Sequence, residues 1–390
     1  MYWNYRETVL TLCTLAFFAT MVGRLAISPV VPLITEEFAV SNSVIGVALT
    51  GMWMAYSTSQ FPSGVLADRV GERPVILLAV GGTAAASLLV ATAPVFVVFV
   101  VGTVSLGALA GLHYSVATAL LSRTYDNIGT AIGIHNGGGP MAGLLAPPIV
   151  AWAGVRYGWR PAVALGAAVA VPVVLLFAWR IRPTEPRQPD RPMRERFKPG
   201  PVLELLTRPT IAFTVVLAVL GTFVWQATAS FLPTFLVVHR GHSTELAGAV
   251  FAGYFLVQAV TQVGVGWLSD RFGRDFATAG CMVLGSTGFA LLVAVPGWLA
   301  LGAAVVLIGT GLGFGAALLP RFMDALSEAE RGTGFGLVRS VYGSLAALGS
   351  VLTGVLADGF GWAVAFAVLG ALLAIVLCAL VGNRALSLGY

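Results

Sequence analysis

Charged residues are scarce in this sequence. Only 10% of its 390 residues are Asp, Glu, Lys or Arg, and 57% are hydrophobic. Soluble globular proteins carry roughly 25% charged residues, and a chain with so few cannot cover a water-facing surface. The composition therefore excludes an ordinary soluble fold and predicts a protein that is covered by lipid.

Cysteine is also scarce, and the sequence lacks any motif of catalysis or nucleotide binding. Cys13, Cys281 and Cys378 lie far apart, each inside an apolar run. This spacing excludes a disulfide framework and a cysteine metal site, so we interpret the three residues as packing residues. The sequence contains no Walker sequence, nucleophile elbow or dinucleotide fingerprint. We therefore expect no enzyme activity, no cofactor and no bound metal.

Long apolar runs are what the sequence does contain. They are about 20 residues long, enough to cross a hydrocarbon core of ~30 Å, and no alternating pattern of barrel strands is visible. The first run is too long for the core of a signal peptide. The expected spans are 8–34, 42–66, 74–93, 95–121, 129–152, 161–181, 209–237, 244–268, 276–295, 297–320, 333–357 and 362–382. The sequence thus predicts an all-α membrane protein with about twelve transmembrane helices.

The basic residues are distributed unevenly between the two sides of these spans. If the N-terminus is inside, 17 of the 22 Lys and Arg lie in cytoplasmic segments, and the outer loops hold only Arg156, Arg160 and Arg240. The positive-inside rule then predicts a multi-pass protein of the cell membrane with both termini in the cytoplasm. The net charge of +5 records this orientation, and we expect no nucleic-acid partner.

The chain divides near its middle into two similar halves. Residues 182–208 form the one long polar segment, rich in Pro and Arg, which is typical of a flexible linker. Gly64–Arg73 recurs as Gly266–Arg274 at an offset of 202, and Gly158-Trp159 recurs as Gly361-Trp362 at an offset of 203. Because six spans separate the copies, the halves are parallel repeats. We expect an N-terminal bundle over 1–182, a cytoplasmic linker over 183–208 and a C-terminal bundle over 209–390.

The repeated motif resembles G-x-L-a-D-R-x-G-r, the signature of the major facilitator superfamily. The first copy supplies Gly64, Asp68, Arg69, Gly71 and Arg73, and the second supplies Gly266, Asp270, Arg271, Gly273 and Arg274. The resemblance covers essentially the whole chain and implies the major facilitator fold, two pseudo-symmetric six-helix bundles. Glu72 and Pro74 depart from the usual basic or small residues of the motif.

The two motif copies are candidates for a conformational latch. Gly71 and Gly273 allow tight turns. The resemblance implies that Asp68 faces the start of the eleventh span, near 332–334, where a helix N-terminus stabilises a carboxylate by about 0.3–1 kcal/mol. By pseudo-symmetry, Asp270 would meet the start of the fifth span, near 127–129. Such contacts would form when the cytoplasmic side closes and break when it opens; the alternative is that the motif only fixes topology.

Two arginines, Arg24 and Arg339, are the only charged residues expected near the middle of the membrane. Charges at that depth are costly and are usually functional, and guanidinium groups bind carboxylates and similar oxyanions in a bidentate manner. We therefore expect an anionic solute. The alternatives are a structural hydrogen-bonding role for Arg24 and a gating or snorkelling role for Arg339.

Polar stripes accompany the arginines. Thr20, Arg24 and Ser28 share one helical face, and the offset of 202 maps them onto Thr222, Gln226 and Ser230. The pattern Arg24-x-x-Ile27-Ser28 also resembles the organic-anion and phosphate branch of the superfamily, in which the arginine is implicated in anion binding. That branch often has a tyrosine and an aspartate just before it, where this chain has Val22 and Gly23.

Four further residues are weaker candidates for the transport path. Tyr254 and Gln258 lie on a third stripe, which either lines a cavity or joins helices. His113 and His135 could carry a coupling proton near neutral pH, or could be packed, neutral side chains.

These features predict a secondary active or facilitative transporter that moves a small anion by rocking its two halves around a midplane site. Protons or a counter-anion could couple to the movement, and we expect a monomer. The alternative is a proton-driven exporter of drugs or other apolar compounds, which the arginines disfavour because they repel cations. A receptor without transport activity is a third hypothesis.

Overall fold

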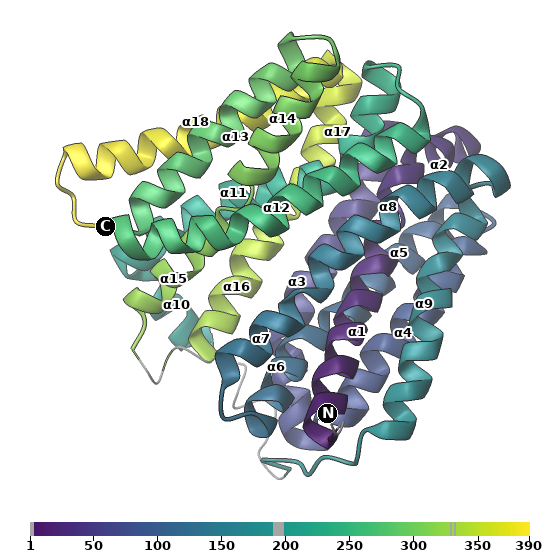
Figure 1. The fold of residues 1–390 in the computed structure, drawn as a ribbon, viewed down its shortest axis with the longest axis vertical. Coiled ribbons are helices and arrows are strands. Elements are labelled where there is room, and N and C mark those ends of the chain that lie inside the picture. Colours follow the sequence, from purple (N-terminus) through teal and green to yellow (C-terminus); the bar gives the residue numbers. More distant parts are fainter. Residues whose placement is uncertain (1–3, 190–198, 328–329, 331–332) are drawn as a thin grey trace.

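The computed structural model describes residues 4–189, 199–327, 330 and 333–390, and this part of the chain contains helices and no strand. Figure 1 shows the helices of the first half, in purple to teal, beside those of the second half, in green to yellow. The prediction of an all-α protein is confirmed.

Helices of the first half follow the expected spans, and several are interrupted. The elements are α1 (Tyr5–Leu25), η1 (Ser28–Val30), α2 (Val31–Phe38), α3 (Asn42–Val70), α4 (Glu72–Ala91), α5 (Phe96–Gly111), α6 (His113–Thr124), α7 (Ile128–Asn136), α8 (Gly138–Tyr157) and α9 (Trp159–Arg180). The break between α1 and α2 lies at Pro29, and that between α7 and α8 lies within a run of three glycines, Gly137 to Gly139. Both residue types disfavour a continuous helix.

The second half repeats this order after the short linker helix α10 (Pro199–Thr207). Its elements are α11 (Pro209–Thr234), η3 (Phe235–His239), α12 (Thr244–Phe272), α13 (Arg274–Ala294), α14 (Trp298–Gly311), α15 (Gly315–Ala325), α16 (Thr333–Ala346), α17 (Leu348–Phe360) and α18 (Trp362–Ala385). The division at 182 and 208 stays a prediction.

Eleven helical segments among the described residues are long and apolar enough to cross a membrane. The remaining expected span is α3, which has 29 residues and is therefore about 43 Å long at 1.5 Å per residue. Polar residues such as Ser57 and Gln60 lower its mean hydropathy, and they are buried inside the protein rather than exposed to lipid. With α3 the described chain supplies twelve spans, as predicted.

The internal repeat is visible in two close helix contacts. In the first half α5 approaches α3 so closely that a methyl group on Gly107 would clash with the carbonyl oxygen of Met52. In the second half α14 approaches α12 in the same way, and a methyl group on Gly309 would lie 3.0 Å from the Tyr254 carbonyl oxygen. Both members of the pair are shifted by 202 residues, so the sequence offset is also a structural one. Small residues permit such packing in lipid, where helices gain little from the hydrophobic effect.

The two halves meet at the ends of the helices remote from the termini. We call this end, marked by Phe38, Gly158, Gly297 and Gly361, the far face, and we call the end that carries both termini the terminal face. A methyl group on Gly46 of α3 would lie 2.9 Å from the carbonyl oxygen of Ser350 of α17.

The pseudo-symmetric contact between α12 and α8 closes the other side of this junction. A methyl group on Gly248 would lie 2.9 Å from the Pro147 carbonyl oxygen. Asp358 of α17 adds a polar contact, because its carboxylate accepts hydrogen bonds from the backbone N–H groups of Asn42 (3.1 Å) and Ser43 (2.7 Å) at the start of α3. The far face is therefore closed by backbone contacts between the halves (Figure 1).

Candidate functional site

A cavity of about 240 Å³ lies between the two halves, near the middle of the helices. Helices α1 and α3 line it from the first half, and α11 and α16 line it from the second. The lining residues are Phe17, Met21, Arg24, Trp53, Tyr56, Ser57, Gln60, Thr222, Trp225, Gln226, Arg339, Tyr342 and Gly343. Arg24, Gln226 and Arg339, three residues singled out in the sequence, thus come together at one space.

Arg24 is almost fully buried, with 2% of its surface exposed, and lies at the end of α1. Its Nε donates to the Thr20 carbonyl oxygen (3.2 Å), and one terminal nitrogen contacts the Met21 sulfur at 2.8 Å. The guanidinium carbon lies 3.8 Å from the ring centroid of Tyr56 and 5.3 Å from that of Trp53. The aromatic faces partly offset the cost of burying the charge. These contacts hold the guanidinium in place, and it still lines the cavity.

Arg339 reaches the same cavity from α16 of the second half. It is half-buried, and its guanidinium carbon lies 4.5 Å from the ring centroid of Tyr114. Tyr56 and Tyr342 are further electrostatic neighbours of Arg339, and Arg24 and Arg339 act on each other as like charges. Two guanidinium groups, one from each half, therefore face a shared space.

No Asp or Glu is among the described residues that line this cavity. Two like charges in a poorly hydrated site repel each other strongly, because the effective dielectric constant is lower than that of water. A carboxylate, phosphate or sulfonate between them would relieve this repulsion and could accept a fork of hydrogen bonds from each guanidinium. Chemically, the site is suited to an anion.

Ser28 and Ser230 lie above the cavity, where they join the halves. The Ser28 hydroxyl donates to the carbonyl oxygen of Ser230 (2.9 Å). The Ser230 hydroxyl accepts from the Trp53 indole N–H at 3.2 Å and pairs with the Ser350 hydroxyl at 2.7 Å. These buried side chains close the cavity toward the far face. Thr20 bonds to the Phe17 carbonyl within α1 and is not among the lining residues.

Tyr254 and Gln258 lie behind the lining residues. Tyr254 is fully buried and packs against Phe251 and Phe255. Gln258 donates to the Leu312 carbonyl oxygen (2.8 Å) and accepts from the indole N–H of Trp225 at 3.4 Å. Tyr254 and Gln258 therefore join α12 to the neighbouring helices, and Gln258 positions Trp225. His113 and His135 are also buried outside the lining set, behind Phe17.

Several lining residues were not among the predicted site residues. Trp53, Tyr56, Ser57 and Gln60 fall at i, i+3, i+4 and i+7 on α3, which is the spacing of one helical face. This stripe was the available signal. It mixes aromatic and polar residues in the one span whose hydropathy is low, and the structure shows that it faces the cavity.

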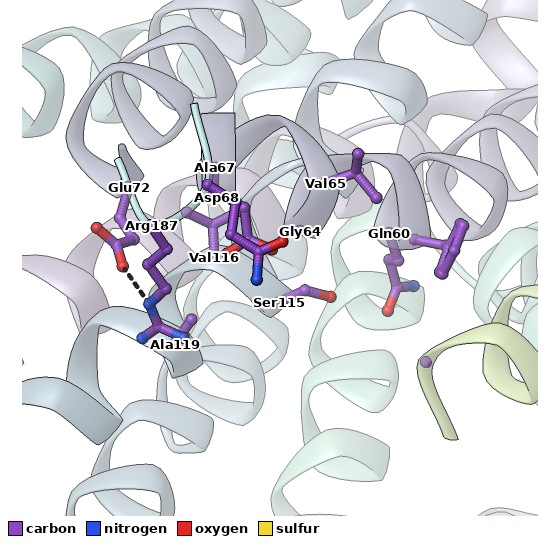
Figure 2. Close-up of a pocket in the computed structure, with 13 residues that line it drawn as sticks. Gln60, Gly64, Val65, Ala67, Asp68, Glu72, Ser115, Val116, Ala119 and Arg187 are labelled. Carbon is purple, nitrogen blue, oxygen red and sulfur yellow. Dashed lines mark ion pairs between the residues drawn. The ribbon is translucent and has the colours of Figure 1, made fainter. Parts of the chain in front are cut away.

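A second space of about 520 Å³ opens from the cavity region toward the terminal face, and Gln60 lines both. We call it the vestibule. Figure 2 shows its lining residues from α3, α6 and the start of the linker, including Asp68, Ser115 and Arg187. Gly336 of α16 belongs to the same lining. The molecule is thus closed at the far face and hollowed toward the terminal face.

The first motif copy forms part of the vestibule wall. The start of the linker is hydrogen-bonded to it. The Asp68 carbonyl oxygen accepts from the Gln188 N–H (2.9 Å), and the Thr184 hydroxyl accepts from the Arg73 N–H (3.0 Å). Glu72, one of the departures from the motif, is buried and pairs with Arg123 at 2.9 Å.

The Glu72 carboxylate also lies 3.8 Å from Arg187 of the linker (Figure 2). Arg69 is exposed. Asp68 and Gly336 line the same space, whereas Gly332, part of the predicted partner of Asp68, lies outside the described residues. The latch therefore stays a prediction.

The second copy makes contacts within its own half. Asp270 pairs with Arg274, which also pairs with Asp324 of α15 at 3.1 Å. The Arg271 guanidinium lies over the rings of Trp267 and Phe272. A methyl group on Gly266 would meet nothing within 4 Å, and the same holds for Gly273.

Gly71→Ala is expected to lower the melting temperature in detergent clearly more than Gly273→Ala. Both glycines have φ near +90° and ψ near 160° (89° and 159°, 98° and 155°), a conformation that costs other residues about 1–3 kcal/mol. Only at Gly71 would the added methyl also collide with the Thr184 carbonyl oxygen of the linker. Thermal unfolding of the two variants side by side checks this, and equal losses would mean that the linker does not stabilise the turn.

One ion pair fastens the end of the linker to the second half. The Arg208 guanidinium donates two hydrogen bonds to Glu330 (2.7 and 3.1 Å). Together with hydrogen bonds from Ser327, Arg208 lowers the pKa of Glu330 from its ordinary 4.5 to about 2. Because the pKa in the folded chain is depressed, the stabilisation is fully present above about pH 4.5 and is lost as the pH falls toward 2. The Arg208–Glu330 ion pair therefore keeps both of its charges between pH 5 and 9.

Two sets of six spans around a central cavity are the architecture of a multi-pass membrane transporter. The chain belongs to the Major Facilitator Superfamily, whose family model matches residues 13–252 and 239–386. The resemblance seen in the motif is therefore confirmed.

Individual relatives differ in their named activities. The chain is 30% identical to the "Transcription regulatory protein OpdE" of Pseudomonas aeruginosa over 85% of this chain and 81% of that protein. It is 23% identical to the "Hexuronate transporter" of Bacillus subtilis over 89% and 87%. Relatives named for drug resistance match as well.

Among solved structures, a bacterial homologue of the human lysosomal transporter Spinster, described as inward-facing and occupied, has a TM-score of 0.80. It is 19% identical and the match covers 98% of each chain. This likeness shows that both halves of the described chain share one fold with that structure.

Proposed function

We propose that this chain is a secondary transporter of small anions that works by alternating access. The observation that supports this most is the central cavity, to which each half contributes one arginine and which has no carboxylate among its described lining residues. The site residues would be Arg24 and Arg339, with Gln226, Ser57 and Gln60 as hydrogen-bonding groups. The relative named as a hexuronate transporter handles a carboxylate, which agrees with this chemistry.

Rocking of the two halves would open the far face and close the vestibule. The closed far face depends on the contacts of Gly46, Gly248 and Asp358, and the Ser28–Ser230 layer would separate when it opens. Asp68 would then approach the start of α16 across the vestibule. Because most of the basic residues lie at the terminal face, we assign that face, with both termini, to the cytoplasm. The unit that moves would be a monomer.

A thermal-shift screen tests the substrate class. Purified protein is mixed with glucuronate, benzoate, sulfoacetate, phosphate, neutral glucose and the cation tetraphenylphosphonium. A ligand at 100 times its Kd stabilises a protein by about 2.7 kcal/mol, so at least one anion is expected to raise the melting temperature, with no effect of glucose or the cation. Uptake of that anion into proteoliposomes follows. Stabilisation by the cation alone would contradict the proposal.

Export of apolar compounds is the second candidate, because five aromatic residues line the cavity: Phe17, Trp53, Tyr56, Trp225 and Tyr342. Efflux that stops with an uncoupler, without any anion flux, would favour it. The Pseudomonas relative is named for a regulatory role, and for a receptor we would expect anion binding without flux in the same liposomes.

A further inference from the structure

Two buried histidines lie side by side in the first half. His113 begins α6 and His135 lies next to the end of α7, and their ring centroids are 5.5 Å apart. Both side chains are fully buried, and none of their four ring nitrogens makes a hydrogen bond of regular geometry. The backbone of Cys13 is within hydrogen-bonding reach of both rings. Burial of a polar group without a partner costs about 1–3 kcal/mol. Buried polar groups without a full set of partners call for an explanation, and a chemical role is one of the recognised ones.

Aromatic rings connect this histidine pair to the cavity by two short routes. Phe17, which lines the cavity, lies 6.1 Å from the His113 ring and 5.2 Å from the His135 ring. The Tyr114 ring lies 5.8 Å from His135 and beneath the guanidinium of Arg339 at 4.5 Å. One side chain therefore separates the histidine pair from each wall of the anion site.

The charged residue that acts directly on the pair, Arg24, is positive. From α1, the backbone of Cys13 offers a hydrogen-bonding group to both rings. Arg24, also of α1, would repel a positive charge on His113. From α6, Tyr114 touches His135, and Arg339 of α16 lies beyond it. Tyr56 of α3 lies under Arg24. The titratable groups of α4 and α8 lie at the ends of those helices, at Glu72, Arg73, Arg156 and Tyr157, and α5 has none.

We propose that His113 and His135 form one proton-binding site that fills together with the anion site. This inference rests on the proposed function. A proton on either ring would add a third positive charge near Arg24 and Arg339, which is unfavourable when the cavity is empty. An anion between the arginines offsets that charge, and by linkage the proton then raises the affinity for the anion by the same factor.

The transport step balances without further reactants. When water reaches the pair from the open face, an imidazole nitrogen takes H⁺ from H₃O⁺, which forms an N–H bond and leaves H₂O. When water reaches it from the other face, the N–H bond breaks and H₂O accepts the proton. One monovalent anion and one proton cross together, so the loaded carrier has the same net charge as the empty one. The transporter is therefore an electroneutral symporter for monovalent anions.

The affinity for a fully ionised anion measures this coupling. Glucuronate, benzoate and sulfoacetate, whose acid groups stay ionised over the range, are titrated into the purified full chain from pH 5.5 to 8.5. For the anion that binds, the Kd is expected to increase by about tenfold per pH unit at the alkaline end, as one bound proton requires. Proton uptake into liposomes, followed with a trapped pH dye, is expected to equal anion uptake.

The variants His113→Gln and His135→Gln separate a proton role from a structural one. Both are expected to flatten the pH dependence and to abolish uphill uptake driven by a pH gradient, while anion exchange at fixed pH continues. His242→Gln, at the far face against Trp298, is the matched control and keeps the wild-type pH profile. The Glu330 carboxylate stays ionised over this range.

The outcomes distinguish the two proposals. Binding of an ionised anion with a Kd that is independent of pH, or an unchanged pH slope in both histidine variants, would overturn the proton site and leave anion transport intact. If none of the three anions binds at any pH, the proposed function and this inference fall together.

Discussion

Arg24→Gln is expected to reduce anion uptake by roughly 100-fold. A charge-assisted hydrogen bond contributes about 1.5–3 kcal/mol, and a guanidinium that binds an oxyanion through two bonds supplies enough for two factors of ten at 1.4 kcal/mol each. Arg24 is already held by Thr20 and by the rings of Tyr56 and Trp53, so binding costs it little conformational entropy. Initial uptake rates in proteoliposomes, with equal amounts of inserted protein, measure the effect.

Two further variants define what the arginine supplies. Arg24→Lys keeps the charge and loses the fork of donors, so we expect partial activity. Arg339→Gln should show a smaller loss, because Arg339 is half-buried. Arg156→Gln, an exposed arginine of α8, is the matched control and should transport normally. Wild-type uptake in Arg24→Gln would remove the site assignment, whatever the family membership implies.

Covalent closure of the far face is expected to stop transport almost completely. Ser43 of α3 and Asp358 of α17 already touch across the two halves, with 2.7 Å between the Ser43 nitrogen and a carboxylate oxygen. In Ser43→Cys with Asp358→Cys, a short bis-methanethiosulfonate reagent would join the halves through two disulfide bonds, and uptake should fall to the level of empty liposomes. A reductant should restore it. The background carries Cys378→Ser, because Cys378 is exposed while Cys13 and Cys281 are buried.

A cross-link within one half provides the control. Glu37 and Arg160 form an ion pair at the same face, and both belong to the first half. Cross-linked Glu37→Cys with Arg160→Cys should keep its activity, because the rocking motion does not separate these residues. If the fully cross-linked pair between the halves still transports at the normal rate, alternating access through the far face is refuted.

The sequence singled out three of the residues that line the cavity, because the position of a residue along a membrane span gives its depth in the membrane. Arg24, Gln226 and Arg339 lie at corresponding depths, and all three line the cavity. Depth alone does not give direction around the helix axis. Tyr254 and Gln258 lie at a suitable depth as well, but their face of α12 packs against α14 and Trp225.

The linker shows the same limit. Its composition predicts a flexible segment, but residues 182–189 bind the first motif through Thr184, Arg187 and Gln188. The interaction depends on Glu72, which looked like a minor departure from the motif in the sequence. Its burial between Arg123 and Arg187 could be seen only once the turn and the linker were placed together.

The sequence by itself determined the membrane environment, the twelve spans and the two-fold internal repeat. These follow from local properties, namely run length, charge distribution and residue spacing, which a linear pattern records completely. The tertiary structure decided which polar faces turn inward, which end is closed and that His113 and His135 lie together. Those outcomes depend on rotations of helices about their axes and on contacts between residues as far apart as Gly46 and Ser350, and in lipid such packing is set by shape rather than by hydrophobic pattern.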